Sequence, residues 1–129
     1  MESIYFPKYS TLILGRAKDV QRMGPRILIV KRGAYGSMAL MDDKIFLLPA
    51  YPTCDVCDPT GAGDSFAGAM MGYIASKGEV SYNLLKTAVA YGTVVGGFCV
   101  EDFSIKKLEE LTPQKVAERL IKLKEMTAF

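Results

Sequence analysis

The sequence predicts a fold of the α/β class. Its first half contains short apolar segments of β-branched or alternating residues, which are typical of strands, at 26–30, 37–41 and 44–48. Its second half shows the i, i+3, i+4 recurrence of apolar residues that is typical of amphipathic helices. With 129 residues, of which 50% are hydrophobic and 23% are charged, the chain fits one globular domain over 1–129.

The strands are expected to follow a poorly patterned N-terminal region. Residues 1–24 have no clear period, and only a short helix over about 17–23 is predicted, closed by Pro25. The apolar run 26–30 predicts a buried strand. Segments 37–41 and 44–48 flank Asp42-Asp43, which predicts a β-hairpin.

The first predicted helix of the second half starts near Ser65 and ends at Gly78. Its apolar positions share one face: Phe66, Ala69, Met70, Tyr73 and Ile74. Gly68 and Gly72 lie four residues apart on a second stripe. Each glycine costs a helix about 1 kcal/mol relative to alanine, so the pair predicts close packing of another backbone against this stripe.

Two more helices are expected. Ser81 is a candidate N-cap for a helix to about residue 94, which Gly96-Gly97 is expected to end. Thr112-Pro113 combines an N-cap with proline at the first helical position, and predicts a last helix to about residue 126.

Composition argues against several functional classes. The net charge is only +2, and no clustered basic face suggests nucleic-acid binding. No apolar run approaches the ~20 residues of a membrane span, and no signal peptide is visible at the N-terminus. The chain is therefore expected to be soluble and cytoplasmic, without nucleic-acid or membrane partners.

The cysteines are expected to be ordinary thiols. Cys54 and Cys57 form a C-x-x-C pair, but a zinc site needs further ligands, and the chain has no histidine and only Cys99 besides. A redox C-x-x-C would open a helix, whereas Asp58-Pro59 follows here and disfavours one.

The segment 58–68 has the composition of a phosphate-binding loop. It reads Asp-Pro-Thr-Gly-Ala-Gly-Asp-Ser-Phe-Ala-Gly and runs directly into the predicted helix. The first N–H groups of a helix have no internal partner, and the macrodipole favours an anion there. Glycines let a bulky anion approach these N–H groups, so the loop predicts a phosphate cradle.

Asp64 adds a carboxylate to this cradle. Beside a bound phosphate it would repel the anion, unless a metal ion or a reacting hydroxyl lies between them. This arrangement suits phosphoryl transfer to an alcohol, with Asp64 as general base. The alternative from the residues alone is a glycine-rich turn in which Asp64 only caps the helix. Neither a P-loop nor the Rossmann dinucleotide pattern is present.

The segment from Asp58 to Ala69 resembles the C-terminal signature of the ribokinase family of carbohydrate and nucleoside kinases, also called the phosphofructokinase B family. The resemblance implies part of a three-layer α/β/α fold with a mostly parallel sheet, and ATP with Mg²⁺ as cofactors. It implies that Asp64 is the catalytic base, and that the backbone N–H groups of Gly61, Ala62 and Gly63 form the anion hole.

The resemblance also implies nucleotide-binding residues. Residues 31–36 resemble the family's strand-end loop, where Gly33 and Gly36 border the nucleotide, and 88–100 resembles the helix and turn over the adenine. The expected nucleotide contacts are Lys31, Gly33, Gly36, Ala88, Tyr91 and Gly92. Lys31-Arg32 replaces the commoner threonine-leucine, so Lys31 either contacts the phosphates or is a solvated strand end.

A monovalent cation site is a further implication. In members that bind K⁺, the position of Asp58 contributes to the site, with Thr60 nearby. The alternative is that Asp58 caps the loop by accepting from backbone N–H groups.

Family members are usually about 300 residues long, so the resemblance covers roughly their last two-fifths. The part that carries most of the acceptor pocket is not matched. We therefore expect a fragment of a sugar or nucleoside kinase that is inactive by itself and associates with the missing half or with itself. The alternative is a non-catalytic remnant that binds nucleotide or contributes an interface.

Overall fold

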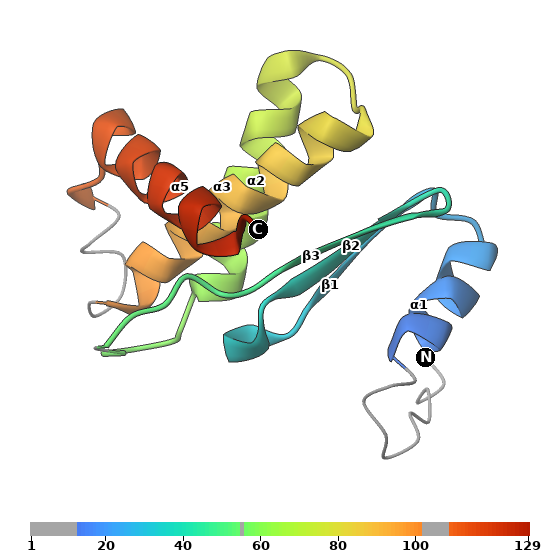
Figure 1. Cartoon of the computed structure of the whole chain (residues 1–129), viewed down its shortest axis with the longest axis horizontal. Helices are drawn as coiled ribbons and strands as arrows, with labels where there is room; N and C mark the ends of the chain where they lie inside the picture. Colours follow the sequence, from blue (N-terminus) through green and yellow to red (C-terminus); the bar gives the residue numbers. More distant parts are fainter. Residues whose placement is uncertain (1–12, 55, 102–108) are drawn as a thin grey trace.

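A computed structural model describes residues 13–54, 56–101 and 109–129 of the chain. The helices and strands follow in the order α1, β1, β2, β3, α2, α3 and α5 (Figure 1). Their bounds are Ile13–Arg22 (α1), Ile27–Lys31 (β1), Ser37–Met41 (β2), Lys44–Leu48 (β3), Ala62–Lys77 (α2), Tyr82–Val100 (α3) and Pro113–Thr127 (α5). A single 3₁₀ turn, η2, covers Gly33–Tyr35 between the first two strands.

The strands form an antiparallel sheet in the order β1-β2-β3. The predicted bounds of β2 and β3 are confirmed, and β1 lies one residue later than predicted. The register places Lys31 opposite Ser37, and Ser37 opposite Leu48. Every strand pair among the described residues is antiparallel, so the parallel strands expected for the complete fold are not part of the described sheet.

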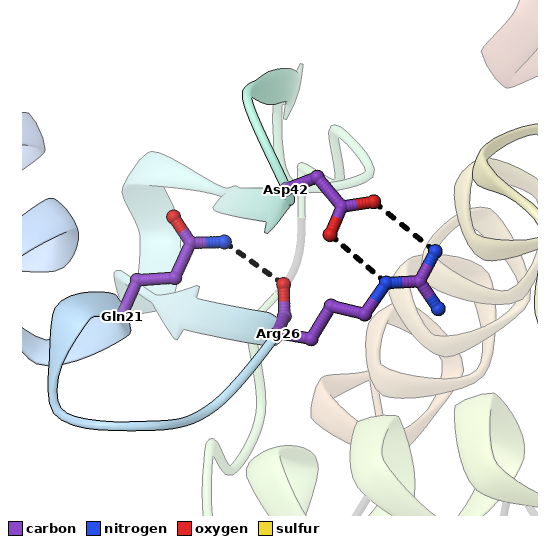
Figure 2. Close-up of polar contacts among 3 residues, drawn as sticks. All are labelled: Gln21, Arg26 and Asp42. Carbon is purple, nitrogen blue, oxygen red and sulfur yellow. Dashed lines mark hydrogen bonds and ion pairs between the residues drawn. The ribbon is translucent and has the colours of Figure 1, made fainter.

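The turn between β2 and β3 is held by a bidentate ion pair between Arg26 and Asp42 (Figure 2). Asp42 has a φ of 54°, in the left-handed region that aspartate tolerates in turns. The Arg26 Nε lies 2.9 Å from Asp42 Oδ1, and a terminal guanidinium nitrogen lies 3.1 Å from Oδ2. Gln21 of α1 donates to the Arg26 carbonyl at 2.8 Å. The hydrogen bond from Arg26 lowers the pKa of Asp42.

Helices cover both faces of the sheet, as the three-layer prediction requires. The residues of β2 alternate between the faces, and the whole strand is buried. Ala39 and Met41 belong to the core formed with α2, α3 and α5, whereas Met38 and Leu40 pack with Ala17 of α1. Figure 1 accordingly shows α1 on the opposite side of the sheet from the other helices.

The interface between α2 and α3 corrects one prediction. Gly96 and Gly97 do not end α3, which continues to Val100. A Cβ on Gly96 would lie 3.3 Å from the carbonyl oxygen of Ala62, and one on Gly97 would lie 3.1 Å from the Tyr51 side chain. The two glycines therefore allow close approach of neighbouring segments inside a helix, and do not act as helix breakers.

The prediction for Gly68 and Gly72 is also wrong. Both are exposed on α2, and a Cβ at either position would meet no atom within 4 Å in the described structure. The close backbone contact occurs instead at Gly92 of α3, where a Cβ would lie 2.8 Å from the Phe66 carbonyl oxygen.

The predicted helix ends are largely confirmed. Gly78 closes α2 in the left-handed conformation, with φ at 81°. The Ser81 hydroxyl accepts from the Leu84 N–H at 3.1 Å, and the Thr112 hydroxyl accepts from the Lys115 N–H at 3.2 Å. In the N-terminal region, α1 starts at Ile13, earlier than the predicted residue 17.

The central helix α3 is long and apolar enough to meet the length and hydropathy of a membrane span, contrary to the sequence expectation. Half of that stretch is buried inside the structure. Leu85, Ala88, Val89 and Val94 each lie in the core with at most 1% exposure. These properties are those of the core helix of a globular fold.

Candidate functional site

A cavity of about 610 Å³ lies where the β1–β2 loop, the segment after β3, the start of α2 and the last turns of α3 meet. Most of its lining residues are small or apolar. Among the predicted site residues it contains Lys31, Gly33, Gly36, Ala62 and Gly63. The structure therefore brings together residues that lie more than 30 positions apart in the sequence.

The β1–β2 loop bends sharply at its two glycines. Gly33 and Gly36 have φ values of 58° and 88°, which favour glycine strongly. The Arg32 N–H donates to the Gly36 carbonyl at 2.8 Å and closes the loop. Gly36 also lies against the backbone of Leu48 and Pro49, where a Cβ would come within 2.7 Å of the Pro49 Cα.

The start of α2 presents free backbone N–H groups. Gly61 is the N-cap, with a φ of 82°, and no side chain caps the helix. Within the described part of the chain, the N–H groups of Gly61, Gly63 and Asp64 make no hydrogen bond. The Ala62 N–H donates to the Pro59 carbonyl at 3.2 Å, so it would have to exchange that bond to contact an anion.

Two interactions hold this loop against the end of α3. The N–H groups of Cys57 and Asp58 both donate to the Val100 carbonyl, at 2.7 and 3.2 Å. The buried Cys99 thiol donates to the Thr60 carbonyl at 3.7 Å. These contacts fix the loop before α2 begins. Cys54 and Cys57 are free and exposed, as expected for ordinary thiols.

Lys31 brings a positive charge to the same helix end. Its Nζ donates to the Gly63 carbonyl at 3.2 Å. A Cβ on Gly63 would lie 3.0 Å from this nitrogen, so glycine makes room for the ammonium group. The positive charge of the ammonium group and the positive end of the α2 dipole therefore lie together, and both favour an anion at this helix end.

Asp64 lies in the first turn of α2 and is exposed. It makes no hydrogen bond or ion pair with any described residue, and it is not the residue that caps the helix. The N-cap alternative for Asp64 is therefore wrong. It shares the first turn of α2 with the free N–H groups, and it is not among the residues that line the cavity.

Asp58 caps the loop. Its Oδ1 accepts from the Thr60 N–H at 2.9 Å. Hydrogen bonds from the side chain and the backbone of Thr60 lower the pKa of Asp58. The described residues contain no group of three His, Cys, Asp or Glu side chains that could hold a metal ion.

The titration of Asp58 is expected to report this capping interaction. Its pKa lies below the ordinary 3.8, so the stabilisation is complete above pH 3.8 and is lost as the pH falls through the lower, folded value. An NMR titration of the Asp58 carboxyl carbon measures that midpoint. Thr60→Val removes the hydroxyl at similar shape and should move the midpoint back toward 3.8. A wild-type midpoint at or above 3.8 would contradict the interpretation.

Three predicted nucleotide contacts lie outside the cavity. Ala88 is fully buried in the core, and Gly92 packs against Phe66. Tyr91 stacks on Tyr73, with ring centroids 4.7 Å apart, and lines a second cavity between β3, α3 and α5. The structure does not bring these three residues to Lys31 and Gly63.

The structure adds an aromatic wall that sequence reasoning missed. Tyr51 lines the cavity and lies against Gly97. The Arg119 guanidinium of α5 stands between two rings, 4.7 Å from the Tyr51 centroid and 3.6 Å from the Phe98 centroid. It also pairs with Glu101 at 2.6 Å. A cation held between two rings and a carboxylate fixes the position of the Tyr51 ring.

The chain matches the model of a known protein family. A profile described as "pfkB family carbohydrate kinase" matches residues 10–110. A fructokinase from Salmonella thompson is 30% identical over 104 residues, which cover 74% of this chain and 47% of that protein. A nucleoside kinase from Methanocaldococcus jannaschii is 39% identical over 98 residues, which cover 74% of this chain and 30% of that protein.

Solved structures give the same picture. An aminoimidazole riboside kinase from Salmonella enterica, complexed with aminoimidazole riboside and an ATP analog, superposes with a TM-score of 0.71 at 25% identity. The match covers 83% of this chain and 35% of that one. A nucleoside kinase of the ribokinase family from M. jannaschii gives a TM-score of 0.63 at 33% identity, over 75% of this chain and 30% of that one. The chain thus spans between 30% and 47% of the length of these relatives.

Proposed function

Because the chain belongs to the pfkB family of carbohydrate kinases, we propose that it forms the nucleotide-binding and catalytic part of a kinase that transfers a phosphoryl group from ATP to an alcohol of a sugar or nucleoside. The observation that supports this most directly is the hydrogen bond from Lys31 to Gly63, which brings an ammonium group of the cavity to the helix turn that carries the free N–H groups and Asp64. The wall formed by Gly33, Ala34, Gly36, Ser37 and Tyr51 provides room for the rest of the nucleotide.

The phosphate end of the nucleotide would lie at the start of α2. The N–H groups of Gly61 and Gly63 are free to donate to it, and Ala62 joins them after leaving Pro59. Lys31 would exchange its bond to the Gly63 carbonyl for one to a phosphate oxygen, because a charged acceptor binds an ammonium group more strongly than a carbonyl does. These donors would stabilise the charge that develops in the transition state.

Asp64 would accept the proton of the acceptor alcohol. Its exposed position, beside the N–H groups and without a competing partner among the described residues, leaves the carboxylate available to a substrate hydroxyl. The hydroxyl becomes acidic only as its bond to phosphorus forms, so an aspartate of ordinary basicity is sufficient.

The metal ions would depend on few protein side chains. Mg²⁺ commonly keeps several waters and binds through one or two carboxylates together with substrate phosphates. This fits a site with Asp64 alone at the helix start, and the ion would neutralise phosphate charge there. A monovalent cation such as K⁺ at Asp58 and Thr60 remains a weaker proposal, because the Asp58 carboxylate already accepts from Thr60.

The acceptor pocket would be formed by a part of the kinase that corresponds to the regions of the relatives that this chain does not cover. The chain covers 47% of the Salmonella thompson fructokinase and 35% of the aminoimidazole riboside kinase chain. We therefore propose that the 129-residue chain alone phosphorylates little or nothing, and that it works together with the missing part in a soluble, cytoplasmic enzyme. The same coverage favours a second candidate function, a nucleotide-binding remnant without catalysis.

Nucleotide binding by the 129-residue chain tests the proposal. Addition of Mg·ADP to ¹⁵N-labelled protein is expected to shift the amide signals of residues 31–37 and 61–64, because they line the cavity or open α2. Lys31→Met should weaken binding about ten- to a hundredfold, the effect of one charge-assisted contact. Lys44→Met is the matched control, because the Lys44 ammonium lies over the Tyr82 ring and not at the cavity. Shifts confined to the second cavity, around Tyr91 and Lys86, would contradict the proposal.

A further inference from the structure

One polar group in the cavity wall has no partner. Ser37 is the first residue of β2, is only 7% exposed and lines the cavity. Its hydroxyl oxygen is completely buried and makes no hydrogen bond with any described residue. Buried hydroxyl groups are nearly always hydrogen-bonded, because leaving one unpaired costs free energy. Such an exception inside a cavity wall indicates that a ligand supplies the missing hydrogen bond.

The sheet register places this hydroxyl on the cavity side. Ser37 is directly opposite Lys31, and side chains of directly opposite residues lie on the same face. The Lys31 side chain reaches Gly63 on that face, and Ala39, two residues further along β2, packs there against the core of α2 and α3. Serine has three staggered side-chain positions, so its hydroxyl can change direction without any movement of the backbone.

Most residues that line the cavity with Ser37 are uncharged, among them Gly36, Ala50, Tyr51 and Gly97. Lys31 lies directly opposite Ser37 in the sheet, and its charged end extends to the Gly63 carbonyl at the start of α2. The glycines leave flat backbone surface, and Tyr51 supplies an aromatic ring. This surface suits a flat heterocycle with a polar edge and not a phosphate group.

We propose that Ser37 determines base recognition in this cavity, with its hydroxyl bonding the polar edge of the nucleobase of the bound nucleotide. The inference rests on the proposed nucleotide-binding function. A serine hydroxyl both donates and accepts, so it can serve the ring nitrogens and the exocyclic groups of a purine. Ligand binding then satisfies a group that the free protein leaves unpaired.

Ser37→Ala separates this role from a structural one, because the two roles predict opposite changes. Removal of an unpaired buried hydroxyl should leave the unfolding midpoint of the ligand-free protein unchanged or raise it. The same change should weaken the binding of ADP about three- to tenfold, the loss of one hydrogen bond. NMR titration of the 129-residue chain gives the affinities, and thermal unfolding gives the midpoint. Thr87→Val, on the far side of α3 with its hydroxyl bonded to the Asn83 carbonyl, should change neither affinity nor selectivity.

Two further ligands identify the part of the nucleotide that Ser37 contacts. The Ser37→Ala change should weaken the binding of adenosine and of 2′,3′-dideoxyadenosine by the same factor as the binding of ADP, because both compounds keep the base. A loss seen with ADP alone would place the hydroxyl at the phosphates, and a loss absent from the dideoxy compound would place it at the ribose; either result overturns the proposal. Equal affinities of wild type and variant, or a lowered unfolding midpoint of the ligand-free variant, also overturn it. Failure of wild type to bind ADP at all would instead overturn the proposed function itself.

Discussion

Asp64→Asn is expected to lower phosphoryl transfer about 10²–10⁴-fold, the contribution of a general base, while nucleotide binding stays unchanged or becomes somewhat tighter. Asparagine keeps the shape of the side chain and cannot accept the proton. It also removes a negative charge from the start of α2, where we propose that the phosphates bind. A loss of turnover without a loss of binding distinguishes a base from a binding residue.

The measurement needs a complete kinase domain. A chimera in which this chain replaces the matching 98 residues of the M. jannaschii nucleoside kinase would supply the acceptor pocket. Asp43→Asn, in the exposed hairpin turn, is the control for the loss of one carboxylate. Turnover of the Asp64→Asn chimera within a few-fold of an active parent would refute the role of Asp64. A parent chimera that binds nucleotide without turnover would favour the nucleotide-binding remnant.

Gly36→Ala is expected to have the largest effect on stability, about 2–5 kcal/mol. Two penalties add at this position. The φ of 88° is strained for any residue with a side chain, and the new methyl group would collide with the Leu48 carbonyl oxygen and the Pro49 Cα. These atoms belong to the backbone and cannot move without displacing the end of β3. Because typical domains are stable by only 5–15 kcal/mol, the variant should unfold at much lower denaturant concentration.

Gly33→Ala is the matched control for this prediction. Gly33 lies in the same loop with a positive φ of 58°, but a Cβ there would meet no atom within 4 Å in the described structure. Its cost should therefore be limited to backbone strain, about 1–2 kcal/mol. Urea denaturation followed by circular dichroism gives both values. Equal destabilisation of the two variants would show that the collision with Leu48 and Pro49 is relieved without cost.

The sequence predicted the local elements well where one face is apolar and the ends carry specific residues. The hairpin of β2 and β3 was found at its observed bounds, because Asp42-Asp43 separates two short apolar runs. The N-caps Ser81 and Thr112 and the C-cap Gly78 were found because each satisfies orphan backbone groups by a local hydrogen bond or a left-handed residue. These are interactions between neighbours in the chain, and they leave a mark in the sequence.

Glycine was the residue most often misinterpreted. Gly96-Gly97 resembled a helix end, yet both lie inside α3 in close contact with other segments. Gly68 and Gly72 resembled a contact stripe, yet a Cβ at either position would meet no atom within 4 Å in the described structure. Glycine favours both a chain break and the close approach of a second segment. Which one applies depends on whether another backbone lies opposite, and that is a tertiary property.

The candidate site was predicted only in its local part. The loop 58–64 and the β1–β2 loop could be found because their glycines and the flanking carboxylates lie within short segments. Tyr51 and Ser37 were missed, since an aromatic residue after a strand and a serine at a strand start are common in any protein. Their importance comes from the cavity that surrounds them and from Arg119, which reaches Tyr51 from a helix 68 positions later.

The contact between Arg119 and Tyr51 has a consequence for folding during synthesis on the ribosome. The strands, the loop before α2 and the two central helices all leave the exit tunnel before α5 does. Until α5 emerges and the Arg119 guanidinium reaches the two rings, Tyr51 lacks the contact that holds it. A nascent chain therefore completes the wall of its cavity only after α5 has left the exit tunnel.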